Sequence, residues 1–281
     1  MTVTILGLGL IGGSIALSLK ENKFADLVIG VDSNIDHILT ALDLRIVDKV
    51  MRLSDAIAQA DIIILAIPVD MLSTMLPHVL NLISENQVVI DVGSTKKIII
   101  DKIKSHPKRR NFIATHPMAG TEFSGPKAAI PNLFTNKNCV LCDVDDSKPE
   151  LVEIIENMYT NGLKMKVMYL ESTSHDVHTA YISHISHICS FALASTVLAK
   201  EENENNIFNL ASTGFESTVR LAKSNPETWI PIFRQNQQNI IEVMDEYINT
   251  LHSYRNLMLA GDYEVLKKML WQANQIKYVL S

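Results

Sequence analysis

The sequence has little of several features that define specialised protein classes. It has three cysteines in 281 residues, at Cys139, Cys142 and Cys189, which are too few for a disulfide framework and favour a reducing cytoplasm. Its net charge is −6 with acidic and basic residues interspersed, so we expect neither nucleic acid nor an anionic membrane as a partner. No run approaches the roughly 18 apolar residues of a membrane helix. The strand-like residues 3–6 follow Met1 too closely to leave room for a signal peptide.

Glycine is scarce in the second half, since eight of the eleven glycines lie within residues 1–125. In that first part, short runs rich in Val and Ile alternate with stretches of helical spacing such as 12–21 and 54–60. This alternation predicts an α/β fold with a parallel, doubly wound sheet of the Rossmann type. We expect strands at residues 3–6, 27–31, 62–67, 88–92 and 112–114, and two more at 138–144 and 164–169 around a helix at 149–161.

Beyond about residue 170, helical patterns take over. Apolar residues from Ile230 to Leu251 step mainly by three, four or seven, and Pro226 suits a first helical turn, so we expect one helix from 226 to about 259. Such a helix, about 50 Å long, suggests packing against another subunit. We expect residues 200–206 to form a solvated connection. The predicted domains are an α/β domain at 1–170 and an all-helical dimerisation domain at 171–281.

A glycine-rich turn follows the first expected strand. Residues 7–12 form a G-x-G-x-x-G pattern, with a strand before it, an apolar helix after it and a second strand beyond. We expect Gly7 to allow the tight turn, Gly9 the approach of a pyrophosphate, and Gly12 the packing of helix on sheet. The helix N-terminus favours the phosphate anions. The cofactor-binding candidates are Gly7, Leu8, Gly9, Leu10, Ile11 and Gly12.

Asp32 ends the second expected strand, twenty residues after Gly12. Its carboxylate can accept hydrogen bonds from the ribose hydroxyls, and it repels a 2′-phosphate. No arginine follows in residues 33–36, so the sequence favours NAD over NADP. Ser33 and Pro68, which follow the expected strands 27–31 and 62–67, complete the cofactor candidates from the first strands.

Polar segments follow two later strands at the same sheet edge. Ser94 and Thr95 can touch cofactor and substrate there, although either hydroxyl equally suits a helix N-cap. Lys96 beside them is typical of a solvated helix lysine. His116 follows residues 112–114, whose strand directs it toward the nicotinamide end of the cleft. A neutral imidazole there can accept a proton from a hydroxyl while hydride leaves the substrate.

The sequence resembles prephenate dehydrogenases, the enzymes of tyrosine biosynthesis. The shared motifs cover nearly the whole chain in the family's order: GLGLIGGS at 7–14, DVGSTK at 91–96, THPMAGTEFSG at 115–125, SHISH at 183–187 and GFESTVRLAKSNPETW at 214–229. The resemblance implies oxidative decarboxylation of prephenate to 4-hydroxyphenylpyruvate with reduction of NAD. It also implies a homodimer through the C-terminal helices, and no metal.

The resemblance also assigns two catalytic residues. His116 accepts a hydrogen bond from the ring hydroxyl and assists its deprotonation, while Ser94 orients His116 and the nicotinamide. Hydride departure needs an alkoxide-like oxygen, and aromatisation then drives loss of the ring carboxylate.

Four further residues are implied as substrate-binding. Arg220 stands where the family places an arginine for one carboxylate, and His184 matches a histidine near the other. Glu122 and Trp229 lie around the mouth of the site, and Arg220 and Trp229 are expected to reach the partner subunit's cleft. Simpler interpretations of Arg220, His184 and Trp229 are a surface ion pair, a packed helix histidine and plain core, respectively.

The sequence departs from the family pattern at Ser217, where Asp is frequent, at Val219, where Thr is frequent, and at Ser186, where Pro is common. These departures leave substrate preference open. Arogenate, the amino analogue of prephenate, is one alternative; another small hydroxy acid and a catalytically silent NAD-binding regulator are the others. Because the helical domain is expected to reach Ser281, we expect no separate allosteric module.

Two sets of potential metal ligands are set aside. Cys139 and Cys142 form a C-x-x-C within an expected strand, where residues three apart face opposite sides, and no second pair accompanies them. A second set, near Glu171 and Asp176, lacks evident convergence of three or four ligands; its histidines are His175, His178, His184 and His187.

Overall fold

The computed structural model describes residues 1–204 and 207–279. The chain divides into two compact units, Met1–Asn236 and Gln237–Ser281. The domain boundary at residue 170 stays a prediction.

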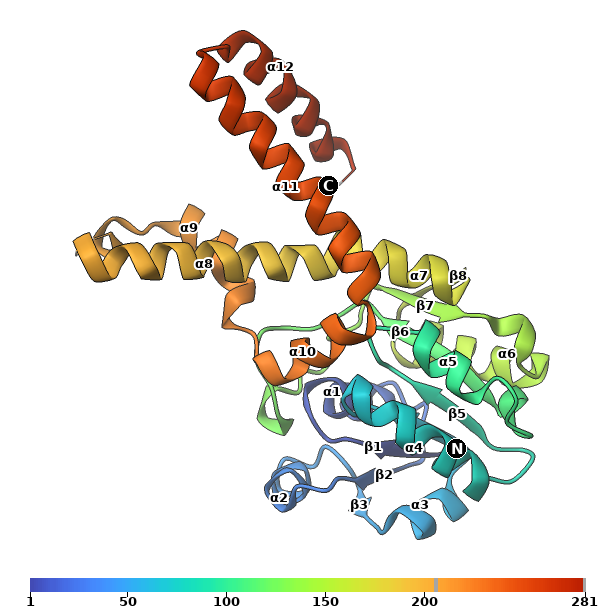
Figure 1. Ribbon diagram of the computed structural model, residues 1–281. Helices are drawn as coiled ribbons and strands as arrows, with labels where there is room; N and C mark the ends of the chain where they lie inside the picture. Colours follow the sequence, from blue (N-terminus) through green and yellow to red (C-terminus); the bar gives the residue numbers. More distant parts are fainter. Residues whose placement is uncertain (205–206, 280–281) are drawn as a thin grey trace. The chain divides into compact units, whose positions relative to one another are not determined.

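The first unit is built on an eight-stranded sheet of order β3-β2-β1-β4-β5-β6-β7-β8 (Figure 1). Strands β1 to β6 are parallel, which confirms the Rossmann-type sheet. The strands are β1 (Thr2–Leu6), β2 (Leu27–Val31), β3 (Lys49–Val50), β4 (Ile62–Leu65), β5 (Val88–Asp91), β6 (Phe112–Pro117), β7 (Asn138–Cys142) and β8 (Lys166–Leu170).

The direction of the last two strands was not predicted. Strand β7 pairs antiparallel with β6, and β8 pairs parallel with β7, so both run against the first six. A parallel neighbour needs a long crossover, usually a helix, and the described residues 118–137 contain only the short 3₁₀ turn Pro126–Ala128. Helix α6 (Pro149–Asn157) then provides the crossover from β7 to β8. The two-residue strand β3 is also absent from the sequence prediction, because it is too short to show a pattern.

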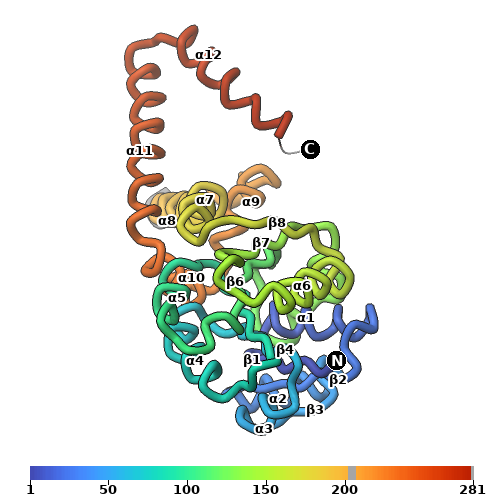
Figure 2. Tube along the Cα trace, turned by 90° about the vertical axis from the view of Figure 1, so that its right-hand side faces the viewer, coloured from blue at the N-terminus to red at the C-terminus, as the bar shows by residue number. Residues whose placement is uncertain are grey.

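Two apolar layers lie on the faces of the sheet, because successive strand residues point to opposite sides. In β4, Ile62 and Ile64 belong to one layer, and Ile63 and Leu65 belong to the other. Helices α1 (Leu10–Glu21) and α6 cover the first layer. The second is covered by α3 (Leu53–Gln59), α4 (Val69–Leu82) and α5 (Lys97–Ile103). Figure 2 shows α1 and α6 on one side of the sheet and α4 and α5 on the other. Helix α2 (Ile35–Asp43) follows β2.

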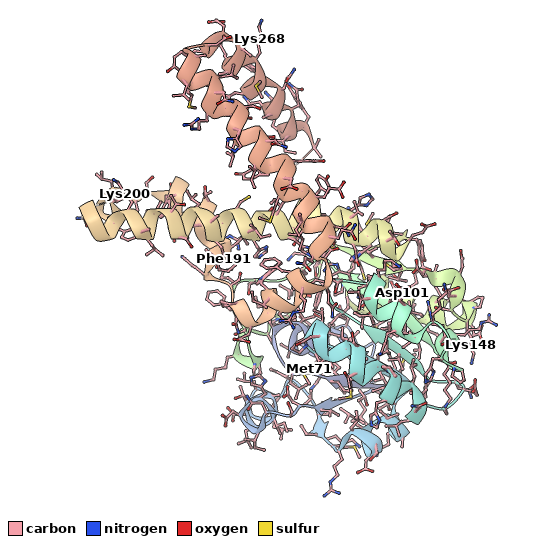
Figure 3. All side chains as sticks on the ribbon, in the orientation of Figure 1. Met71, Asp101, Lys148, Phe191, Lys200 and Lys268 are labelled. Atoms are coloured by element: carbon pink, nitrogen blue, oxygen red, sulfur yellow. The ribbon has the colours of Figure 1, made fainter. Side chains whose placement is uncertain are left out.

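A long helical run follows β8. It comprises α7 (Ser172–Thr179), a π-helical segment (Ala180–His184) and α8 (Ile185–Glu204). By length and composition, Ser172–Glu201 is apolar enough to cross a membrane, which qualifies the expectation that no such segment exists. Side chains such as Phe191 and Lys200 project from α8 (Figure 3).

The predicted connection at 200–206 needs correction, because α8 continues through Glu204. Residues 205 and 206 lie outside the described residues. Helix α9 (Thr213–Val219) and a 3₁₀ turn (Arg220–Lys223) then lead to α10 (Pro226–Gln235).

The single helix expected from 226 to 259 is two helices, α10 and α11 (Gln237–Ala260), separated at Asn236. The buried Asn236 amide nitrogen donates to the carbonyl of Asp176 at 2.7 Å and lies 3.1 Å from Nδ1 of His184. These contacts hold Asn236 outside helical geometry, so the helix breaks there. The spacing of apolar residues could not predict this break, because it shows only which side of a helix is apolar. In the second unit, α12 (Tyr263–Ala273) follows α11 after a turn at Gly261.

We expect Asn236→Ala to lower the free energy of unfolding by about 1–3 kcal/mol, because it leaves buried acceptors on Asp176 and His184 without their donor. Urea unfolding followed by circular dichroism measures this change. Asn249→Ala, on an exposed part of α11, is the control and should stay within about 0.5 kcal/mol of the parent. Equal stability of both variants would contradict a structural role for Asn236.

Candidate active site

The glycine-rich loop joins β1 to α1 at the carboxyl end of the parallel strands. Gly7 has φ +93°, and a Cβ there would lie 2.2 Å from the carbonyl oxygen of Ala66, so this position requires glycine. A Cβ at Gly12 would lie 2.0 Å from the carbonyl oxygen of Gly7. At Gly9, by contrast, a Cβ would meet no atom within 4 Å. The loop is therefore tight at Gly7 and Gly12 and open at Gly9, the N-cap of α1.

Asp32 joins β2 to this loop. One of its carboxylate oxygens accepts the N–H of Leu8 at 2.8 Å and lies 3.4 Å from Nδ1 of His37, and the other accepts the N–H of Asn34 at 2.8 Å. The side chain keeps about a tenth of its surface exposed. Asp32 thus fixes the shape of the turn, and its remaining lone pairs can accept from ribose hydroxyls.

The other cofactor candidates lie at the same edge. The side chain of Leu8 is buried, Leu10 and Ile11 are partly buried, and Ser33 and Pro68 are exposed at the ends of β2 and β4. Thr95 is buried, and its hydroxyl donates to Oε1 of Gln235 at 2.6 Å. Gln235 in turn donates to the carbonyl of Val69 at 2.7 Å, so α10 is attached to the loops after β4 and β5.

His116 lies near the end of β6 with 8% of its surface exposed. Burial is the main cause that holds its pKa well below the ordinary histidine value, and the neighbouring His175, Lys96 and His184 act in the same direction. The ring is therefore neutral at neutral pH and able to accept a proton.

The partner of the His116 ring is a residue that the sequence interpretation set aside. Nδ1 of His116 lies 2.8 Å from Nε2 of His175, and Nδ1 of His175 lies 2.8 Å from Oδ1 of Asp176. Within the described residues, no hydrogen bond joins His116 to the partly buried Ser94, so the orienting role of Ser94 stays a prediction. In the sequence, the only indication of the contact between His116 and His175 was that His175 and Asp176 are adjacent, and both residues were considered there only as potential metal ligands.

Lys96 is fully buried, which corrects its interpretation as a solvated helix lysine. Its ammonium group donates to the carboxylate of Asp91 and, at 2.7 Å, to the carbonyl of Thr115, the residue before His116. A charged lysine can be buried in this way because its partners are charged or polar and close.

Arg220 and Glu122, which lie 98 residues apart in the chain, form an ion pair at 3.3 Å. The Arg220 side chain is 51% exposed and Glu122 19%. Ser190 on α8 supports this segment, since its hydroxyl donates to the carbonyl of Thr218 and accepts the N–H of Ala222, both at 3.0 Å. Arg220 therefore contacts a residue of its own chain.

Two histidines of the SHISH motif have different surroundings. His184 is fully buried, its Nε2 has no hydrogen-bond partner among the described residues, and burial lowers its pKa to about 4. His187 is partly exposed and stacks on Trp229, with ring centroids 3.4 Å apart. Burial and the charge of Arg220 lower the pKa of His187. His187, which the sequence interpretation left out of the site, thus lies with Trp229 on the Arg220 side.

The potential metal ligands set aside above do not come together as a metal site within the described residues. Cys139 and Cys142 lie on opposite layers of the sheet, and burial raises the pKa of the Cys142 thiol to about 12. Across the described residues, no three His, Cys, Asp or Glu side chains form a group that could hold a metal.

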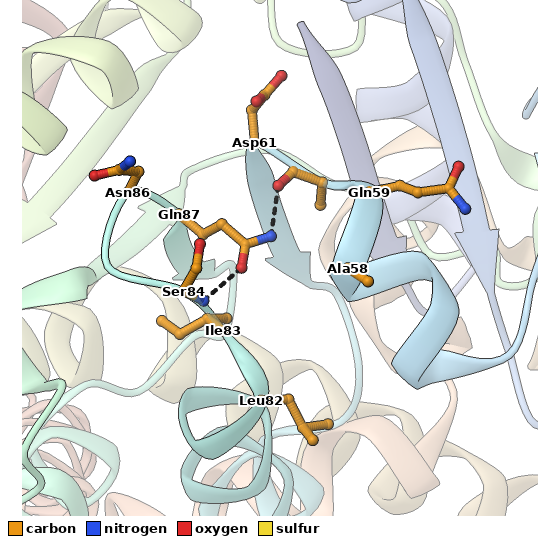
Figure 4. Close-up of a pocket in the computed structure, with 9 residues that line it drawn as sticks. Ala58, Gln59, Asp61, Leu82, Ile83, Ser84, Asn86 and Gln87 are labelled. Carbon is orange, nitrogen blue, oxygen red and sulfur yellow. Dashed lines mark hydrogen bonds between the residues drawn. The ribbon is translucent and has the colours of Figure 1, made fainter.

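A surface pocket lies at the opposite, amino end of β4 and β5, between Gln59, Ser84 and Gln87 (Figure 4). The Gln87 amide accepts the N–H of Ser84 and donates to the carbonyls of Ile57 and Ala60. The amide of Gln87 is thus bonded to backbone groups of the fold. We therefore retain the carboxyl end of the sheet as the candidate active site.

Two family models match the chain. The nucleotide-binding domain of prephenate dehydrogenase matches residues 15–169, and the dimerization domain of prephenate dehydrogenase matches residues 171–272.

Individual relatives agree with these matches. A prephenate dehydrogenase of Bacillus subtilis is 32% identical over 272 residues, which is 94% of this chain and 72% of that protein. The crystal structure of a prephenate dehydrogenase from A. aeolicus with hydroxyphenyl propionate and NAD+ has a TM-score of 0.91 and 27% identity, covering 100% of this chain and 98% of the other. That of a Synechocystis arogenate dehydrogenase has a TM-score of 0.78 and 28% identity, with 99% coverage of both.

The loop geometry generates a paired prediction. Gly9→Ala should leave the free energy of unfolding within about 0.5 kcal/mol but weaken NAD binding at least about tenfold, because its methyl group projects into open space that a pyrophosphate would occupy. Gly7→Ala should lower the free energy of unfolding by at least about 2 kcal/mol, because its Cβ would clash with the backbone of Ala66. Thermal unfolding and NAD titration measure both, and NAD binding by Gly9→Ala at parental affinity would refute the placement of the phosphates.

Proposed function

The chain belongs to the prephenate dehydrogenase family of oxidoreductases, and we propose that it converts prephenate to 4-hydroxyphenylpyruvate and CO2 with NAD as the oxidant. The observation that carries this proposal is the buried, neutral imidazole of His116 at the carboxyl end of β6, the sheet edge where the glycine-rich loop also lies.

The choice of NAD rests on the residues after β2. Asp32 offers carboxylate lone pairs, residues 33–36 include no arginine, and the open space at Gly9 fits a pyrophosphate. The nicotinamide ring, when bound, accepts hydride from the substrate carbon that carries the hydroxyl. We assign phosphate and ribose contacts to the loop 7–12, Asp32 and Ser33, and the nicotinamide side to Pro68, Ser94 and Thr95.

His116 serves first as a base and then as an acid. Its Nε2, which has no hydrogen bond among the described residues, accepts the proton of the ring hydroxyl as hydride leaves the same carbon, which gives a ring carbonyl. The bond to the ring carboxylate then breaks, CO2 leaves, and the electron pair aromatises the ring to a phenolate. The phenolate takes the proton back from His116, so neither atoms nor charge are left over.

The two substrate carboxylates require donors. Arg220 can hold one through its guanidinium group, and its exposed half leaves room for this contact beside Glu122. For the other carboxylate, His187 has better access than the predicted His184, because His187 is partly exposed. Its Nδ1 lies 3.1 Å from the carbonyl of Ser183, and among the described residues its Nε2 has no hydrogen bond. Trp229 supports His187 by stacking on it.

The substrate analogue arogenate is the second candidate, favoured by the similarity to the Synechocystis enzyme. The amine of arogenate would seek a carboxylate, and Glu122, the acidic residue of the proposed substrate group, already pairs with Arg220. This pairing supports prephenate.

Dimerisation accounts for the exposed apolar side chains of the helical part. On α8, Leu198 is 55% exposed; in the second unit, Leu259 and Trp271 are 70% and 58% exposed. Apolar surface on this scale is typical of a subunit interface. We therefore assign the C-terminal helices to a homodimer, and the low cysteine content supports a cytoplasmic enzyme.

The test of the function is NADH formation with prephenate or arogenate and NAD or NADP. We expect turnover with prephenate and NAD, and His116→Asn should lower kcat by about 10²–10⁴-fold with unchanged NAD affinity. Preference for arogenate would change the substrate, and NAD binding without turnover would leave a silent regulator.

Because the pKa of His116 is lowered, the active neutral form should persist as the pH falls through 6.5, and kcat/KM should decline only well below it.

Arg220→Met should raise KM for prephenate by about 10–100-fold with a smaller effect on kcat, because one charge-assisted pair to a carboxylate is lost. Lys223→Met removes a cation of the same 3₁₀ turn that pairs with Glu216 instead, and it serves as the matched control. An equal effect of both substitutions would assign Arg220 only a general electrostatic role.

A further inference from the structure

A chain of hydrogen bonds leads from His116 into the helical half of the sequence. It runs from Nδ1 of His116 to Nε2 of His175, and from Nδ1 of His175 to Oδ1 of Asp176, with both distances 2.8 Å. His175 and Asp176 lie on α7 and are 1% and 3% exposed. Water therefore has little access to these atoms, and each must be satisfied by its neighbour.

The hydrogen bonds to the carboxylate of Asp176 show that it acts as an acceptor. Oδ1 accepts the N–H of Lys96 at 2.8 Å, and Oδ2 accepts the N–H of Lys97 at 3.0 Å. Both oxygens thus accept from backbone N–H groups, and a carboxylate can only accept hydrogen bonds. Nδ1 of His175 must therefore carry a proton and donate it to Asp176.

The remaining protons follow in order. A neutral His175 with a proton on Nδ1 has a lone pair on Nε2, so Nδ1 of His116 must be the donor between the two rings. Nε2 of His116 then has a free lone pair. The opposite arrangement, with Nδ1 of His175 unprotonated, would set two lone pairs against each other beside Asp176.

We propose that His175 and Asp176 are positioning residues that hold His116 as the tautomer with its proton on Nδ1, so that Nε2 is free to accept the substrate proton. This inference rests on the proposed function. Neither residue contacts the reacting atoms; they act through the orientation and protonation of His116.

The same chain stabilises the proton that His116 takes up. The cation formed in the reaction keeps its bond from Nδ1 to His175, which in turn donates to the negative charge of Asp176, so no group has to reorient. This stabilisation matters because Lys96 and His184, which lie near His116, oppose a positive charge on its ring.

The tautomer is directly measurable in the wild-type protein without substrate. In ¹⁵N-labelled protein, two-bond ¹H–¹⁵N correlation spectra distinguish protonated from unprotonated ring nitrogens, and the His116→Asn spectrum identifies the His116 signals. We expect protonated Nδ1 and unprotonated Nε2 at His116, and the same pattern at His175. A protonated Nε2 at a neutral His116, or a doubly protonated His175, would overturn the proposal whether or not the protein turns over prephenate.

Matched substitutions at His175 test its effect on catalysis. His175→Gln can still present an acceptor oxygen to Nδ1 of His116, whereas His175→Leu cannot. We expect His175→Leu to lower kcat by about 10²-fold with little change in KM, and His175→Gln to recover part of that loss. His178→Gln, on the exposed side of α7, is the control and should match wild type. If wild type is active and His175→Leu equals it, the proposal fails; if wild type is inactive, the proposed function fails and the spectra still decide the tautomer.

Asp176→Asn provides a second, independent variant. An amide keeps one acceptor for the backbone N–H groups but removes the charge that fixes the His175 proton, a change that costs about 10⁴ in kcat in a serine protease triad. We expect kcat to fall by at least about tenfold and His116 to show a mixture of tautomers. Unchanged kcat together with a single Nδ1-protonated tautomer would overturn the role of Asp176.

Discussion

The rest of the site depends on the hydrogen bonds that the carboxylate of Asp176 accepts. This carboxylate receives the N–H groups of Lys96 and Lys97, where α5 begins after β5, and it also receives Nδ1 of His175. One ionised group thus joins the loop beside the proposed nicotinamide position, the first helix after the sheet and the imidazole of His116. Because Lys96, His116, His175 and Asp176 are buried, the orientation of their groups is determined by one another more than by water.

Much of the fold could be predicted from local patterns. The five strands from β1 to β6 other than β3 appear as apolar runs, and the tight turn at Gly7 appears as a motif, because each is encoded by adjacent residues. The antiparallel direction of β7 and the break at Asn236 could not be predicted in this way. The first depends on how the chain returns after β6, and the second on a side chain that bonds to Asp176, 60 residues earlier.

The residues of the site likewise include some that could be predicted from the sequence and some that could not. The sequence brought Glu122, Arg220 and Trp229 into one hypothesis through the family resemblance, and the structure pairs Glu122 with Arg220. Periodicity alone could not separate His184 from His187, because both lie on the same part of the helical run, and only their neighbours distinguish them. His175 stands in the sequence among four histidines that were set aside as potential metal ligands. Its contact with His116 could not be predicted, because the two residues lie 59 positions apart in the chain.

The position of Asp176 also bears on how separable the two halves of the sequence are. A chain that stopped near residue 170 would keep every strand of the sheet but would leave the N–H groups of Lys96 and Lys97 and the ring of His116 without their partners. Water could replace the lost partners of the N–H groups, but it would not reproduce the fixed donor and acceptor that orient the His116 ring. The nucleotide-binding half therefore depends on α7 for the arrangement of its own proposed base, and exchanging the C-terminal half for an unrelated one would remove that arrangement.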